Sequence, residues 1–191
     1  MGIGFDKKSW SNKMEEIIKQ IKKQQEINFK NVEDQIRFAD LETVFDNENN
    51  SRYIFHYLHS MDRFFINPST YVYEGSIEEN LSIIDSARAG YIADKSIVIP
   101  RKQLLEYFES VKSKINTYFE TLTVEQLIEK PEGCEYSRLE FILAQFRHLM
   151  WHTGVSSAIT FISKGKWNEF TGLAGLRKMF FSDIICRSFD L

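Results

Sequence analysis

Apolar residues recur at steps of three and four along several segments of the chain. The clearest series lies between Pro100 and Leu122, with apolar positions at Leu104, Phe108, Val111, Ile115, Tyr118 and Leu122. This is the period of an α-helix that packs one side against other helices. A second series predicts a helix over residues 52–65, whose apolar arc is formed by Tyr53, Tyr57, Leu58, Met61, Phe64 and Phe65.

The N-terminal part of the chain has a shorter periodic stretch. It predicts a first helix with apolar positions at Trp10, Met14, Ile17 and Ile21. From about Gln24 to Phe45 the period weakens, so we expect a kink or a break in that region.

Two capping boxes mark helix starts in the C-terminal half. Ser137 with Glu140 stands directly before an apolar run, and Gly165 is a typical residue just past a helix end. Between them we expect one long helix with a core stripe of Phe141, Gln145, His148, His152, Val155, Ile159 and Ile162. Thr123 with Gln126 predicts a short helical turn before it.

Residues 67–99 differ from the periodic segments. They contain Pro68, Gly75 and Gly90, with only a weak helical patch near residues 78–88, which is typical of a long connection. The sequence therefore predicts an all-α fold, a four-helix bundle with one long crossover between its second and third helices. We expect residues 1–191 to form a single domain, with the aromatic tail after Gly165 packed on the bundle or on a partner.

Composition and charge argue against several classes of protein. The net charge is −3 and no block of like charges occurs, which argues against nucleic-acid binding. No run of about 18 apolar residues is present, so we expect no membrane span. The start has no signal-peptide pattern, and Cys134 and Cys186 lack CxxC spacing. We therefore expect free thiols in a cytoplasmic protein.

His148 and His152 are the most informative polar residues of the predicted last helix. Their spacing places both imidazoles on one helix face, one turn apart, where they can bind one ion. Together with Gln145 they interrupt a stripe that is otherwise apolar. Burying one unpaired polar group costs about 1–3 kcal/mol, so these three groups need a common partner. A metal ion is one such partner, and a buried hydrogen-bond network is the other.

A third ligand has to come from another helix, and the helix over residues 52–65 carries His56 and His59. At about 100° per residue, its apolar arc centres between Tyr57 and Met61. His56 borders this arc, whereas His59 lies nearly opposite its centre. We therefore predict that His56 is the inward ligand, and we expect His59 to face solvent or the crossover.

No general base accompanies the histidine pair in the sequence. The residues between the two histidines are Leu149, Met150 and Trp151, so the HExxH motif of metalloproteases is absent. No glycine-rich phosphate-binding motif occurs either. Asp62 and Gln145 are the nearest candidates for a base, and the sequence assigns no catalytic residue.

Two segments resemble the DinB/YfiT-like superfamily. The first, Phe55-His56-Tyr57-Leu58-His59-Ser60-Met61-Asp62-Arg63-Phe64-Phe65-Ile66-Asn67-Pro68, is similar to the second helix of that family. The second runs from Gln145 to Gly154 and resembles its last bundle helix, whose HxxxH is usually followed by Val-Gly. Here Thr153 takes the place of the valine. The resemblance covers roughly residues 52–165.

The resemblance implies a four-helix bundle with a long second connection. It also implies a site for zinc, nickel or a similar divalent ion, with His56, His148 and His152 at the matching positions. Characterised members include low-molecular-weight-thiol S-transferases and thiol-dependent isomerases. We therefore expect a divalent-metal-dependent enzyme that uses a low-molecular-weight thiol and a small-molecule substrate.

Two other functions stay open alongside this expectation. One is non-catalytic binding of a metal or a small ligand, and the other is metal-dependent hydrolysis. We also expect a homodimer, because the aromatic tail and the crossover offer more apolar surface than one small bundle needs.

Overall fold

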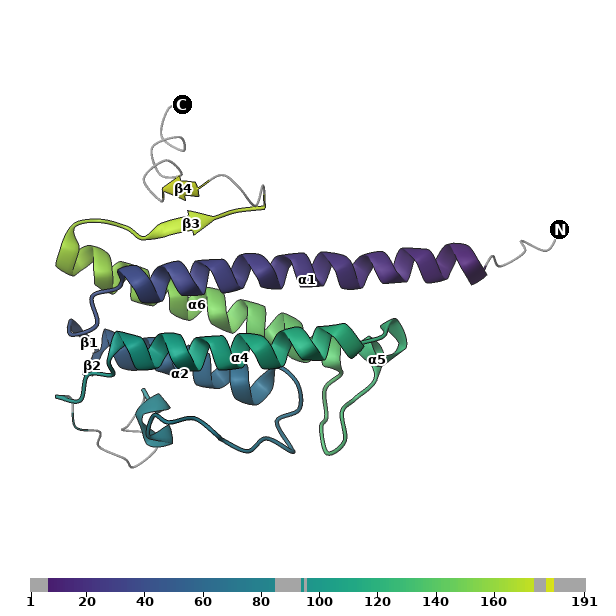
Figure 1. Cartoon of the computed structure of the whole chain (residues 1–191), viewed down its shortest axis with the longest axis horizontal. Helices are drawn as coiled ribbons and strands as arrows, with labels where there is room; N and C mark the ends of the chain where they lie inside the picture. The colour runs from purple at the N-terminus through teal and green to yellow at the C-terminus, as the bar shows by residue number, and fades with distance from the viewer. Residues whose placement is uncertain (1–6, 85–93, 95, 174–177, 181–191) are drawn as a thin grey trace.

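The computed structural model describes residues 7–84, 94, 96–173 and 178–180. This part of the chain is mostly helical. Its helices are α1 (Lys7–Phe38), α2 (Asn50–Phe64), α4 (Arg101–Thr121), α5 (Val124–Ile128) and α6 (Arg138–Lys164), and a 3₁₀ turn, η1, spans Glu79–Ser82. The four long helices lie alongside one another, and the N-terminal end of α1 extends beyond the rest (Figure 1).

Two short antiparallel ribbons complete the described structure. Strands β1 (Val44–Phe45) and β2 (Glu48–Asn49) pair between α1 and α2, and Asn49 also caps the start of α2. Strands β3 (Glu169–Thr171) and β4 (Lys178–Phe180) pair after α6. Neither ribbon was predicted, because strands of two or three residues are too short to show alternation.

Helix α2 packs against two other long helices and the 3₁₀ turn. It contacts α6, α4 and η1, while α1 packs on α4, α6 and β3. The apolar arc of α2 is buried as predicted, except that Phe64 is partly exposed. The predicted stripe of α4 is also confirmed, since it lies buried or partly buried against the core. Burial of these stripes supplies the main force that holds the helices together.

The expected break between Gln24 and Phe45 is wrong for most of its length. Helix α1 continues without interruption to Phe38. Its buried face carries four polar side chains next to the apolar ones: Gln25, Asn28, Asn31 and Gln35. These amides hide the helical period from a pattern that counts only apolar residues.

Both capping boxes and the glycine stop are confirmed. Thr123 and Gln126 cap α5, Ser137 and Glu140 cap α6, and Gly165 ends α6 in the left-handed region with a φ of 66°. A left-handed residue after a helix end favours glycine, which has no Cβ to clash.

The predicted core stripe of α6 is right at its start and wrong at its end. Phe141, Gln145 and Ile159 are buried, but Ile162 is 70% exposed. The second half of α6 instead buries hydroxyl side chains: Thr153, Ser156, Ser157 and Thr160. In this half of the helix the hydroxyl residues and Ile159 form the buried face, whereas Phe161 and Ile162 are exposed.

These hydroxyls belong to a buried hydrogen-bond network that joins three helices. Ser157 donates to Gln35 of α1 at 2.6 Å, and Gln35 donates to Ser156 at 3.0 Å. Ser156 in turn donates to Asn50, at the start of α2, at 2.7 Å. Asn50 also donates to Thr160 at 3.2 Å. Because its members bond one another, the network offsets the cost of burying them.

The connection between α2 and α4 packs against α2. The buried carboxylate of Asp62 accepts hydrogen bonds from Tyr71 at 3.0 Å and from Tyr107 of α4 at 2.9 Å. Lys114 of α4 pairs with the same carboxylate at 3.0 Å. The weak helical patch predicted near residues 78–88 contains η1, and residues 85–93 lie outside the described part of the chain.

The segment after α6 packs back on the helices, as expected. Asn31 of α1 donates to the carbonyl of Thr171, and the Thr171 amide donates back to the Asn31 side chain at 2.7 Å. The Trp167 ring stacks on Phe161 with centroids 4.6 Å apart. The remainder of the tail, residues 181–191, lies outside the described residues. Over the helices that are described, none combines the length and apolarity that a bilayer crossing requires.

Candidate metal centre

The three predicted ligands come together between α2 and α6. His56 lies in the middle of α2, and His148 and His152 lie one turn apart on α6. Because α2 and α6 pack directly on each other, the histidine of one helix meets the pair on the other. One ligand nitrogen from each residue lies within 4.8 Å of the others, a grouping that could hold one metal ion.

The rings form a compact, partly buried triangle. The centroid of His56 lies 5.3 Å from that of His148 and 4.6 Å from that of His152. The centroids of His148 and His152 are 4.4 Å apart. The planes of each pair are strongly inclined, at 55–62°, so the rings do not stack. Imidazoles in this arrangement leave a common space into which their nitrogens can point.

The hydrogen bonds of His56 fix which nitrogen is available to an ion. Its Nδ1 lies 2.7 Å from the carbonyl oxygen of Ser82, in η1. A carbonyl oxygen can only accept, so Nδ1 carries the proton and donates. In the neutral ring the lone pair is then on Nε2, and this nitrogen is the one that can bind a cation.

His148 and His152 have buried nitrogens without partners. The Nδ1 atoms of both rings are inaccessible to solvent and form no hydrogen bond. Leaving such a group unpaired costs about 1–3 kcal/mol each. A metal ion bound among the rings would supply the missing interaction to these side chains. The residues present therefore fit a divalent ion with nitrogen ligands.

The electrostatics of the three histidines favour their neutral forms. Burial, followed by the proximity of His56, lowers the pKa of His148 to about 4. Burial and the two neighbouring histidines lower the pKa of His152 to about 3. Burial also lowers the pKa of His56. All three rings are therefore unprotonated near neutral pH, which is the state that binds metals.

His59 lies on another side of α2, as predicted from its facing. It is buried beneath the crossover, where its Nε2 lies 2.9 Å from the Glu79 carboxylate. Its ring also contacts those of Tyr71 and Tyr73. His59 therefore holds the crossover and is not part of the triangle.

The two candidate bases have other partners. The Gln145 side-chain oxygen accepts a hydrogen bond from Ser60 of α2 at 3.2 Å. The Asp62 carboxylate is bonded to tyrosines and a lysine of the crossover and α4. Cys134 is a free thiol near Asn67, 3.2 Å from its side-chain oxygen, and Cys186 lies outside the described residues.

Sequence reasoning missed the residue that accepts from His56. Ser82 acts through its backbone carbonyl, and a carbonyl leaves no residue-type signature. The only signal was the weak helical patch that contains η1. The position of η1 over α2 depends on how the crossover folds back, and the hydrophobic pattern of the sequence does not predict this.

No family model, curated protein or solved structure matches this chain. The DinB/YfiT-like assignment, suggested by the two sequence segments around the histidines, therefore stays a prediction.

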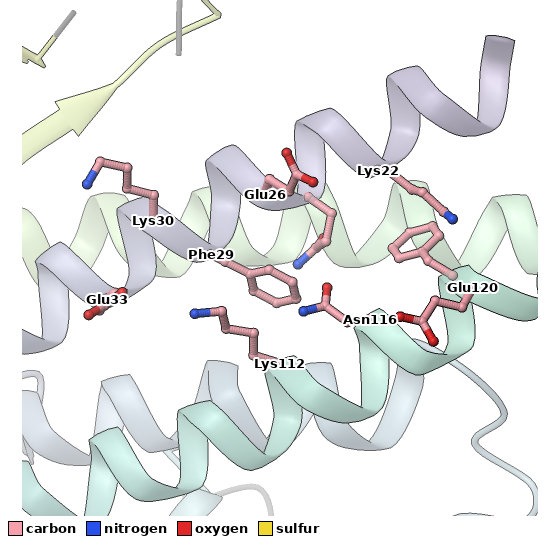
Figure 2. Close-up of a pocket in the computed structure, with 10 residues that line it drawn as sticks. Lys22, Glu26, Phe29, Lys30, Glu33, Lys112, Asn116 and Glu120 are labelled. Atoms are coloured by element: carbon pink, nitrogen blue, oxygen red, sulfur yellow. The ribbon is translucent and has the colours of Figure 1, made fainter. Parts of the chain in front are cut away.

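A separate groove of about 490 Å³ opens between α1 and α4, and none of the three histidines lines it. In Figure 2, lysine and glutamate side chains of both helices surround Phe29. The cations Lys22, Lys30 and Lys112 alternate with the anions Glu26, Glu33 and Glu120. Because the charges are mixed, the groove selects neither an anionic nor a cationic ligand.

Proposed function

We propose that this chain is a divalent-metal-dependent enzyme that uses a low-molecular-weight thiol. In this proposal His56, His148 and His152 bind one zinc or nickel ion. The fold is proposed to be a DinB-like four-helix bundle, formed by α1, α2, α4 and α6, with the crossover between its second and third helices. The sequence segments that resemble the family and the mutual packing of the four helices support this assignment.

The convergence of three neutral imidazoles from two helices carries the proposal. A buried hydrogen-bond network, the other partner suggested by the sequence, does form around α6. However, it involves Gln35, Asn50 and the hydroxyls of the second half of the helix. The Nδ1 atoms of His148 and His152 take no part in it and stay unpaired. A metal ion bound among the three rings would give these side chains a partner, which supports the proposal.

The donor set also bears on the substrate. Neutral histidines do not offset the charge of a divalent ion, so an anionic group is favoured at an open coordination position. The ion would stabilise the thiolate form of a small thiol bound at that position. The protein's own contribution is to hold three neutral nitrogens in one place and to fix His56 through Ser82.

A thiol-transfer assay tests this function. Metal-stripped protein is loaded with zinc, nickel or manganese and supplied with a panel of small thiols and an electrophile. The expected result is consumption of thiol and electrophile that depends on the ion and is absent from His148→Ala. If no thiol binds the loaded protein and none reacts faster than with that variant, the transferase assignment is wrong. Non-catalytic metal binding would then account for the site.

Homodimer formation and a cytoplasmic location belong to the same proposal. Helix α6 exposes large apolar side chains over its outer side, among them Trp151, Phe161 and Ile162. Contiguous exposed apolar surface is typical of an interface. We infer that a second copy of the chain covers this side of α6.

A further inference from the structure

Arg52 is buried at the base of the crossover. Its side chain is 0% exposed, and one guanidinium nitrogen pairs with the buried carboxylate of Glu48. Its Nε donates to the carbonyl of Leu81 at 3.2 Å, and a third nitrogen donates to the carbonyl of Ile83. Arg52 therefore holds the backbone on both sides of Ser82.

The Ser82 carbonyl held between these two contacts is the acceptor for His56. Arg52 precedes His56 by one helical turn on α2, so both side chains reach the same short segment of the crossover. The guanidinium has a rigid planar fork, which sets the spacing of the two carbonyls that it binds. The Ser82 carbonyl between them is thereby fixed relative to α2.

Attachment of the crossover alone does not explain a buried ion pair, because burying two charges is unfavourable. Removing a guanidinium and a carboxylate from water is unfavourable, and apolar side chains of similar volume often serve stability as well or better. What apolar side chains cannot do is fix the direction of backbone carbonyls. The pair of Glu48 and Arg52 does this, and the carbonyl in between orients a proposed metal ligand.

We propose that Arg52 is a positioning residue for the metal centre. By holding residues 81–83, it keeps the Ser82 carbonyl in place to accept from Nδ1 of His56. This selects the tautomer with a free Nε2 lone pair before any ion binds. The inference rests on the proposed metal function. Hydrogen-bond partners of this kind typically change metal affinity by about 10- to 100-fold.

The first test observes the tautomer in metal-free protein. Long-range ¹H–¹⁵N correlation spectra distinguish a histidine protonated on Nδ1 from one protonated on Nε2. In the wild-type protein we expect His56 to be protonated on Nδ1. In Arg52→Lys, which keeps the charge and loses the fork, we expect a mixture of tautomers. A wild-type His56 protonated on Nε2 overturns the inference.

The second test measures zinc affinity by competition with a chromogenic chelator. Arg52→Lys should weaken binding by about 10- to 100-fold. The matched control is Arg101→Lys, since Arg101 also donates to two backbone carbonyls, those of Ile36 and Ala39, but at the end of α1. This control should keep both the wild-type affinity and the wild-type tautomer of His56.

The outcomes separate this inference from the metal function itself. If His152→Ala loses the ion but Arg52→Lys binds it as tightly as Arg101→Lys, the positioning role is wrong and the metal site stands. Wild-type protein that binds no divalent ion overturns both. If Arg52→Lys does not fold, the double variant Glu48→Gln/Arg52→Gln, which removes both buried charges together, is measured in the same way. If that variant also fails to fold, the buried pair serves the stability of the fold and the positioning role is overturned.

Discussion

The ring centroids of His56 and His152 lie 4.6 Å apart, although the two residues belong to different helices. The whole crossover, α4 and α5 separate these helices along the chain. This contact exists because α2 packs directly on α6. His148, one turn away on α6, completes the group. The three imidazoles are close together and partly buried, and two of them have an Nδ1 without a partner, so the group could hold a cation.

The first prediction concerns metal content. Protein purified without a histidine tag should contain up to one divalent ion per chain by elemental analysis. The change His152→Ala removes one of three ligands and should strongly lower the occupancy. If His152→Ala remains fully occupied, the ion is bound elsewhere and the assignment of the site is wrong.

The second prediction separates the two histidines of α2. His56→Ala should weaken metal binding strongly, because the Nε2 atom of His56 is available to an ion. His59→Ala should leave metal affinity nearly unchanged, since the ring of His59 is bonded to Glu79 beneath the crossover. It should instead lower the free energy of unfolding by about 1 kcal/mol through loss of that hydrogen bond. Chelator competition measures the affinities and urea denaturation measures the stability. Equal losses of metal affinity in the two variants would contradict the assignment of His56, and not His59, to the side of α2 that faces the site.

The third prediction is the pH dependence of stability in the metal-free protein. The pKa values of His148 and His152 are lowered to about 4 and about 3 in the folded state, while an unfolded histidine titrates near about 6.5. The unfolded chain therefore binds more protons between these values. Stability should fall as the pH drops below about 6.5, and the loss should continue until the folded rings titrate.

Urea denaturation in the presence of a chelator, between neutral pH and pH 5, measures this effect. The double variant His148→Gln/His152→Gln is the control, since it lacks both titrating groups. Its free energy of unfolding should depend less on pH over this range. An identical dependence in the variant and the wild type would mean that other groups cause it.

The sequence predicted the starts of α5 and α6, the end of α6 and the inward faces of the three histidines because these depend on local signals. Ser137, Glu140 and Gly165 act within one or two turns of the chain, and the spacing of His148 and His152 fixes their common face. The choice of His56 over His59 needed only the angular position of each residue on α2. These features depend on the helix period and on capping, whereas the meeting of the three rings also needs α2 to pack on α6.

The features that the sequence did not predict depend on contacts between distant segments. Gln35 and Ser157 look like surface residues by type, yet they bond each other in the core. Because these buried residues are polar, the apolar pattern did not predict that α1 continues to Phe38. For the same reason it placed Ile162 on the buried face of α6, where the structure has hydroxyl residues instead. Likewise, only the folded crossover brings the Ser82 carbonyl to His56.

The fourth prediction compares two buried glutamines of α1. Gln25 is 1% exposed, and neither polar atom of its side chain has a hydrogen-bond partner. Gln25→Met has nearly the same shape and should raise the free energy of unfolding by about 1–3 kcal/mol, since it removes an unsatisfied amide. Gln35→Met should lower it by a similar amount, because Ser157 loses its acceptor and Ser156 loses one of its two partners. Urea denaturation measures both, and shifts of the same sign would contradict the hydrogen-bond assignment.

The last prediction concerns self-association through α6. The segment from Phe141 to Ser163 contains a single charged residue, Arg147, so the outer side of α6 is nearly free of charge. Trp151 is 71% exposed and Ile162 is 70% exposed, and the two lie about three turns apart on the same side of the helix. An isolated exposed apolar residue is common, but an uncharged side of this length in contact with water is unfavourable.

A second copy would cover this side of α6 in a symmetric dimer, with each subunit presenting the same surface. Sedimentation velocity at tens of micromolar should therefore show a dimer. Ile162→Lys should shift the protein toward monomer, because it places a charge within the apolar surface that the second copy would cover. Ile128→Lys is the matched control, since Ile128 is 73% exposed on α5 and should leave the dimer intact. A monomeric wild-type protein, or equal effects of the two lysines, would mean that α6 is not the interface.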